Sequence, residues 1–197
     1  MQESIKQRVE AAPAGTIFIT SDFADVATVP AINVALSRMT NDDKLRRVMR
    51  GVYEKPRFNE LLGELVAPNI EQVAHAIARN FNWSIAPAGD TALNLLGLSS
   101  QVPAVWQFVS DGPYKEYVCR GVKIKFSHSA NKEISGKSPI TAIAIQAIKA
   151  LGKNISKADI EMMRSVISDC DKGIILREAQ GTTAWVYDVI KEIVGDV

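Results

Sequence analysis

The chain has little cysteine and little histidine, and this excludes several classes of protein. Its two cysteines, Cys119 and Cys170, are too few for a disulfide scaffold or for a zinc site built from cysteines. Its two histidines, His75 and His128, cannot form a histidine-rich metal site. We therefore expect reduced thiols and no metal centre. A chain of 197 residues is long enough to bury a core without either.

A strong net charge and a long apolar run are also absent. The 23 basic and 22 acidic residues give a net charge of +1, so any signal for a nucleic-acid partner has to be local. The N-terminus has no apolar signal core. The uncharged run from Thr91 to Ser110 has the length of a membrane span, but polar residues, Pro103 and a turn-like Gly97-Leu98-Ser99-Ser100 interrupt it. We expect a cytoplasmic protein without membrane contact.

The first 56 residues carry an ordered series of helix and strand signals. Helices are predicted over residues 2–12, 23–27 (after the capping residues Ser21 and Asp22) and 28–40, and strands over 16–20, 45–49 and 52–53. The order is helix, strand, two helices and a hairpin that turns at Arg50-Gly51. This order is typical of a winged helix-turn-helix, which we predict over residues 1–56.

The predicted hairpin is rich in basic residues, with six between Lys44 and Arg57 against one acidic residue, Glu54. Lysine and arginine displace counterions from DNA, so one concentrated patch suffices on a nearly neutral protein. A solvated basic edge that deters strand pairing is the alternative. We predict DNA contacts from the outer face of the third helix and from the hairpin, through Asn33, Ser37, Arg38, Lys44, Arg46, Arg47, Arg50 and Lys55.

Residues 57–197 predict a mixed domain with a small antiparallel sheet and C-terminal helices, which makes the whole chain α+β. Helices are predicted over residues 70–81, 90–96, 139–151, 156–167 and 185–193, strands over 102–109, 114–119 and 122–126, and a turn over 86–89. Six basic residues against two acidic ones lie between Lys115 and Lys137. Lys115, Arg120, Lys123 and Lys125 are therefore candidates for a second basic surface.

Two short motifs leave an enzyme as an alternative. Ser135-Gly136-Lys137-Ser138 resembles the second half of a phosphate-binding loop, but the glycine that a complete motif requires is replaced by Asn131. Ser138 as a helix cap explains the tetrad equally well. Asp169 and Asp171 have the spacing of carboxylates in metal-dependent transferases, although a capping role is favoured. An adaptor that binds protein through its winged helix is a second alternative.

Several runs resemble the AbiE-type antitoxins of abortive-infection systems, which form type IV toxin–antitoxin pairs. The N-terminal runs are Gly15-Thr16-Ile17-Phe18, Asp22-Phe23, Ala35-Leu36-Ser37-Arg38-Met39 and Arg50-Gly51-Val52-Tyr53. The middle runs are Pro87-Ala88-Gly89, Ala92-Leu93-Asn94, Leu96-Gly97-Leu98-Ser99-Ser100-Gln101-Val102-Pro103 and Ser110-Asp111-Gly112-Pro113. The resemblance covers about residues 5 to 150, and the helices after Ile155 lie outside it.

The resemblance implies a repressor that binds the promoter of its own operon through the N-terminal domain. It also implies a C-terminal domain that counteracts a nucleotidyltransferase-like toxin. By position, the DNA-contacting surface implied in this way includes Asn33, Ser37, Arg38, Arg46, Arg47 and Arg50. Such a protein needs neither a catalytic centre nor a cofactor, so we expect a regulator rather than an enzyme.

Overall fold

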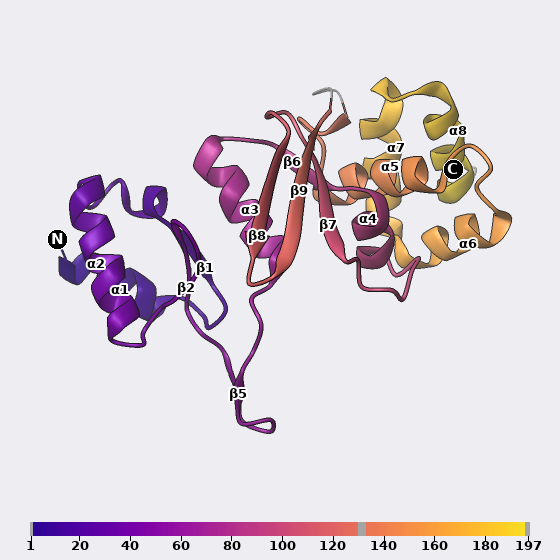
Figure 1. The fold of residues 1–197 in the computed structure, drawn as a ribbon. Helices are drawn as coiled ribbons and strands as arrows, with labels where there is room; N and C mark the ends of the chain where they lie inside the picture. Colours follow the sequence, from indigo (N-terminus) through magenta and orange to yellow (C-terminus); the bar gives the residue numbers. More distant parts are fainter. Residues whose placement is uncertain (1, 130–132, 196–197) are drawn as a thin grey trace. The chain divides into compact units, whose positions relative to one another are not determined.

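The computed structural model describes residues 2–129 and 133–195 and has a mixed α+β fold (Figure 1). The chain divides into two compact units, which are described separately below. The N-terminal unit comprises residues 2–82 and 118–122, and the C-terminal unit comprises residues 83–117 and the described residues from 123 to 195. The boundary between the units therefore follows Asn82, whereas the sequence pattern placed a domain boundary after Pro56.

The N-terminal unit begins with a small sheet and the helices packed on it. Its first elements are α1 (Gln2–Ala11), β1 (Ile17–Ile19), the 3-10 helix η1 (Thr20–Phe23), α2 (Val29–Asn41), β2 (Arg46–Met49) and β3 (Val52–Glu54). The sheet order is β1-β3-β2 and both pairings are antiparallel. The strands β2 and β3 confirm the predicted hairpin, with Arg50-Gly51 at its turn.

A single apolar cluster holds these elements together. The apolar face of α2 is buried, and it packs with apolar residues of α1, β1, η1 and β3. The cluster contains Ile5, Val9, Phe18, Phe23, Ile32, Ala35, Leu36, Met39, Leu45 and Tyr53. Burial of such side chains is the main force that fixes α2 against the sheet.

The segment before α2 differs from the prediction of a helix over residues 23–27. The structure has a 3-10 helix over Thr20–Phe23 followed by turns, and α2 begins after Thr28 with Pro30 in its first turn. The Asp22 carboxylate accepts a hydrogen bond from the backbone N–H of Ile19 at 2.9 Å. Asp22 therefore caps the 3-10 helix from within it, rather than preceding a helix as an N-cap would.

The rest of the N-terminal unit contains a hairpin that the sequence pattern did not predict. Strands β4 (Phe58–Asn59) and β5 (Glu64–Leu65) pair antiparallel between Pro56 and Pro68. Helix α3 then has the predicted bounds, Ile70–Phe81, and buries Val73, Ala74 and Ile77. Phe81, the last residue of α3, is 47% exposed.

The C-terminal unit combines a four-stranded sheet with a helical bundle. Its elements are β6 (Ile85–Pro87), α4 (Gly89–Leu95), β7 (Val105–Ser110), β8 (Lys115–Cys119), β9 (Val122–His128), α5 (Pro139–Leu151), α6 (Lys157–Val166), α7 (Asp169–Glu178), η3 (Ala179–Gly181) and α8 (Ala184–Val194). The end of β8 and the start of β9, over residues 118–122, are counted with the N-terminal unit. The sheet order is β6-β7-β9-β8, and β7 pairs parallel to β9. The small predicted sheet is therefore present, but one of its pairings is parallel because β9 inserts between β7 and β8.

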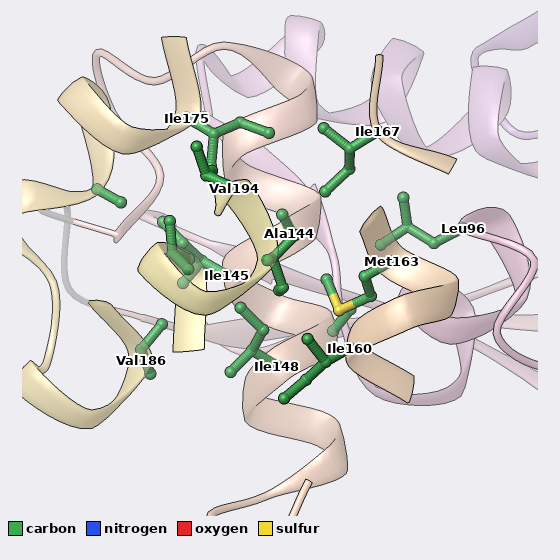
Figure 2. Packing of buried hydrophobic residues seen from close by; sticks show 14 of the residues in the cluster. Leu96, Ala144, Ile145, Ile148, Ile160, Met163, Ile167, Ile175, Val186 and Val194 are labelled. Atoms are coloured by element: carbon green, nitrogen blue, oxygen red, sulfur yellow. The ribbon is translucent and has the colours of Figure 1, made fainter. Parts of the chain in front are cut away.

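Residues 86–89, which were predicted to form a turn, instead complete β6 and begin α4. Ala86 and Pro87 pair with Val109 and Phe108 of β7, so Pro87 lies in an edge strand, where its missing N–H is tolerated. The C-terminal helices pack around α5, which contributes Ala144, Ile145 and Ile148 to a large apolar core (Figure 2). None of the helices in the described part of the chain is long and apolar enough to cross a bilayer.

Candidate nucleic-acid interface

Helix α2 exposes the polar residues that the sequence pattern placed on its outer face. Asn33, Ser37 and Arg38 are all exposed, and so is Val34 at 46%, while Ala35 and Leu36 are buried. The Asn33 side-chain oxygen accepts a hydrogen bond from the Thr20 hydroxyl at 3.1 Å, which ties its amide to η1. This face of α2 therefore offers amide, hydroxyl and guanidinium groups, which are the groups that contact bases and phosphates.

Arg46 is largely buried, and its hydrogen bonds are made inside the N-terminal unit. Its guanidinium forms an ion pair with the carboxylate of Glu54, its partner across the strands, with Nε 2.8 Å from Oε2. It also donates to the backbone carbonyl of Val66 at 2.7 Å. The side chain of Arg46 is only 13% exposed and that of Glu54 only 2% exposed. Arg46 therefore joins the sheet to the segment after β5 and presents little of its charge to solvent.

Lys44 and Lys55 are engaged with the end of α1. Lys44 Nζ lies 3.0 Å from a carboxylate oxygen of Glu10, and its hydrogen bond lowers the pKa of that carboxyl. Lys55 Nζ donates to the backbone carbonyls of Glu10 and Ala12, each at 2.7 Å. A cation at the C-terminus of a helix satisfies free carbonyls and complements the helix dipole. Both lysines thus contribute to the fold of the unit.

Arg47 and Arg50 remain as exposed cations of the hairpin. Arg47 lies on β2 opposite Tyr53, and Arg50 lies at the turn between β2 and β3. Within the described part of the chain, neither forms an ion pair. Of the residues predicted to bind DNA, six are exposed: Asn33, Ser37, Arg38, Lys44, Arg47 and Arg50, and Lys44 among them pairs with Glu10.

The second basic stretch lies on β8, β9 and the turn between them. Lys115, Arg120 and Lys123 are exposed, and Lys125 is half-buried. Lys125 Nζ lies 5.4 Å from the centre of the Tyr114 ring, a cation–π contact that holds its side chain against the sheet. The four cations lie along one hairpin, and charge alone makes this hairpin a candidate surface.

Ser138 is the N-cap residue of α5, and Lys137 lies directly before it. The Ser138 hydroxyl accepts from the backbone N–H of Thr141 at the start of α5. The Glu178 carboxylate accepts from both the backbone N–H and the hydroxyl of Ser138, each at 2.8 Å. Lys137 Nζ donates to the Glu178 carbonyl at 2.5 Å. A carboxylate thus occupies the position where a phosphate would bind at this helix N-terminus.

Asp169 and Asp171 lie in the first turn of α7. Asp169 forms an ion pair with Lys172, and Asp171 interacts with Ser168, the N-cap residue. Acidic residues in the first turn of a helix are stabilised by its dipole, which accounts for both of them. In the described residues, no three potential metal ligands come together.

The sequence pattern also missed an open groove on the N-terminal unit. It is lined by Arg8, Thr16, Ile17, Phe18, Asp22, Gln72, His75 and Arg79. Its guanidinium groups are engaged: Arg8 binds both oxygens of Asp25, and Arg79 binds both oxygens of Asp22. Burial lowers the pKa of His75. These ion pairs fasten α1 and α3 to the loop between β1 and α2.

Several polar residues of the middle runs, between residues 87 and 113, hold turns of the C-terminal unit in place. The Asn94 amide donates to the carbonyls of Ser99 and Gln101 at 3.2 and 3.0 Å, which closes the loop after α4. The Asp111 carboxylate accepts from the backbone N–H of Ser84 at 2.9 Å. These hydrogen bonds fix the backbone around the sheet.

Fold and surface together define an α+β protein of two compact units, with exposed cations on a small N-terminal hairpin. A family model described as a family of unknown function, DUF6088, matches residues 4–181. The match spans most of the chain, and the protein belongs to this family. None of the curated proteins matches the chain significantly.

Proposed function

We propose that residues 1–56, within the N-terminal unit, form a winged helix-turn-helix that binds double-stranded DNA and represses transcription. The supporting observation is the placement of two exposed polar elements within one packed unit. Helix α2 exposes Asn33, Ser37 and Arg38, and the β2–β3 hairpin that follows it exposes Arg47 and Arg50. The shared apolar cluster fixes α2 relative to the sheet, so a duplex meets a preorganised surface.

In this proposal, α2 enters the major groove and the hairpin contacts the backbone. The groove is about 12 Å wide and admits a helix. The 13 residues of α2 span about 20 Å. Asn33 and Arg38 then reach base edges, while Arg47 and Arg50 neutralise phosphates, which gives affinity without sequence information. Arg46, Lys44 and Lys55 support this surface from within the unit.

The experiment measures binding to a duplex from the region upstream of the gene at several salt concentrations. We expect Arg47→Ala/Arg50→Ala to bind more weakly and to reduce the slope of log affinity against log salt by about two, because each arginine neutralises one phosphate. The matched control replaces two exposed lysines of the C-terminal unit, Lys153→Ala/Lys157→Ala, and is expected to leave the slope unchanged. An unchanged slope in the arginine variant would refute DNA binding through the hairpin and favour the protein adaptor.

We propose further that the protein is the antitoxin of a type IV toxin–antitoxin pair. Binding to its own promoter would repress the operon, and the C-terminal unit would counteract a nucleotidyltransferase-like toxin. The support is the resemblance over residues 87–113, which lies within a unit that has its own core. Co-expression with the product of an adjacent nucleotidyltransferase-like gene is expected to restore growth, and Arg47→Ala/Arg50→Ala is expected to retain this protection. Failure of the unmodified chain to protect would refute the antitoxin role.

A further inference from the structure

The hairpin formed by residues 57–66, here called the arm, exposes an unusual amount of apolar surface. Leu61 is 98% exposed, Leu62 69%, Phe58 57% and Leu65 50%. In Figure 1 the arm, which contains β4 and β5, extends away from α1 and α2 of its own unit. Scattered apolar side chains are common on protein surfaces, but contiguous apolar patches mark interaction sites. The arm has four exposed apolar side chains within the eight residues from Phe58 to Leu65.

The arm is an ordered element and not a loose loop. The side-chain oxygen of Asn59 accepts from the backbone N–H groups of Leu61 and Leu62, at 3.0 and 3.2 Å. The Asn59 carbonyl accepts from the N–H of Gly63, which has a φ of 66°. Arg46 holds the base through the Val66 carbonyl. These bonds shape the tip and present Leu61 and Leu62 to solvent, so binding a partner requires little further ordering of the backbone.

In the described part of the chain, no third strand pairs with the arm. Its sheet contains two strands, β4 and β5, which pair with each other. Each strand therefore has one unpaired edge, which is a template for pairing with another chain. A partner that adds strands to the arm would pair its free edges and would also cover its exposed apolar side chains.

The charges of the arm are separated along its length. Arg57 lies at the base, and Glu60 and Glu64 lie toward the tip. All three are exposed, and none forms an ion pair within the described residues. When two arms lie antiparallel, the acidic tip of each meets the basic base of the other. A purely acidic or purely basic partner would match only one end.

We propose that the arm is a dimerisation element that pairs antiparallel with the arm of a second copy of this chain. The two-fold arrangement places the same apolar residues of both copies against each other and sets Arg57 of each copy near Glu60 and Glu64 of the other. The arm supplies ten residues to each side, fewer than the roughly 20–30 of a standard interface. The dimer is therefore weak and depends on concentration. This inference is independent of DNA binding and is tested without DNA.

Sedimentation velocity on the full chain, from about 5 to about 500 µM, tests the proposal. We expect the unmodified chain to pass from monomer to dimer within this range. Leu61→Ser/Leu62→Ser is expected to raise the dissociation constant at least about tenfold, because it removes apolar area that the dimer buries. Val102→Ser/Val166→Ser, which changes two exposed valines elsewhere, is the matched control and is expected to dimerise normally. Unchanged circular dichroism and Tm show that each variant folds.

A charge exchange tests the orientation. Arg57→Glu is expected to weaken the dimer, because it places three acidic residues on each arm. Arg57→Glu/Glu60→Arg/Glu64→Arg reverses both ends and is expected to restore association close to that of the unmodified chain. A chain that stays monomeric at the highest concentration overturns the proposal and leaves the arm to a different protein. A dimer that Leu61→Ser/Leu62→Ser does not weaken, or a charge exchange that fails to restore association, also overturns it.

Discussion

Arg46 and Glu54 face each other across β2 and β3, and the guanidinium donates from Nε and from a terminal nitrogen to the same carboxylate oxygen. Glu54 is almost completely buried, so its charge depends on this one partner. Arg47, the next residue along β2, is exposed and has no ion pair in the described part of the chain. Two adjacent arginines of one basic stretch therefore have different roles.

Arg46→Ala is expected to destabilise the N-terminal unit by about 3–5 kcal/mol, because it leaves the Glu54 carboxylate buried without a partner. Arg47→Ala is the matched control and is expected to change the free energy of unfolding by no more than about 0.5 kcal/mol, since it is a surface substitution. Urea denaturation followed by circular dichroism measures both. Equal stabilities of the two variants would contradict the structural role of Arg46.

Reversal of two charges on β9 tests the second basic surface. If Lys123 and Lys125 contact phosphate, Lys123→Glu/Lys125→Glu is expected to weaken DNA binding and to reduce the salt slope by about two. The control Lys153→Glu/Lys157→Glu makes the same change in net charge at a distance in the sequence. Fluorescence anisotropy of a labelled duplex reports both affinities. If the slope stays at its original value, this stretch does not belong to the binding surface.

The cap of α5 predicts a pH-dependent stability. Hydrogen bonds from Thr141 and Ser138 lower the pKa of the Glu178 carboxyl below its ordinary value of 4.5. Because this pKa is lower in the folded than in the unfolded protein, the stabilisation is complete above about pH 4.5–5 and is lost as the pH falls through the folded value. Glu178→Gln is expected to lower stability at pH 7 and to flatten the acid limb of the stability curve.

Urea unfolding at a series of pH values from about 3 to about 7 measures this dependence. Glu161→Gln, at an exposed position on α6, serves as the control and is expected to keep the profile of the unmodified protein. Ser138→Ala removes the cap itself and is expected to cost about 1 kcal/mol. An acid limb that Glu178→Gln leaves unchanged would show that this carboxylate does not act through the cap.

Two glycines of the C-terminal unit predict opposite effects of the same substitution. A Cβ at Gly112 would lie 2.3 Å from Cε2 of Trp83, and a rigid ring cannot yield cheaply. Gly112→Ala is expected to cost about 1–3 kcal/mol through overpacking. Gly173 lies inside α7 with nothing within 4 Å of an added Cβ, so Gly173→Ala is expected to stabilise by up to about 1 kcal/mol. Thermal unfolding monitored by circular dichroism compares the two, and a drop in Tm for both would contradict this account.

Local signals predicted much of the secondary structure. The periodic spacing of apolar residues predicted the helices over residues 70–81 and 156–167, which the structure contains as α3 and α6. Where only three-dimensional pairing decides, the prediction failed. Proline is typical of turns, but Pro87 lies in β6 and pairs with Phe108 of β7. The strands β4 and β5 are too short to show the alternation of apolar and polar residues that predicts a strand.

The α+β class, the helices with strong periodicity and the concentration of cations between Lys44 and Arg57 can all be predicted from the order of the residues. Which of those cations are engaged inside the unit depends on how the chain folds in three dimensions. Arg46 meets a buried carboxylate and Lys55 meets two carbonyls, because the antiparallel pairing of β2 and β3 and the end of α1 bring these groups together. Charge is a property of each residue, whereas its availability to a ligand depends on neighbours that are distant in the chain.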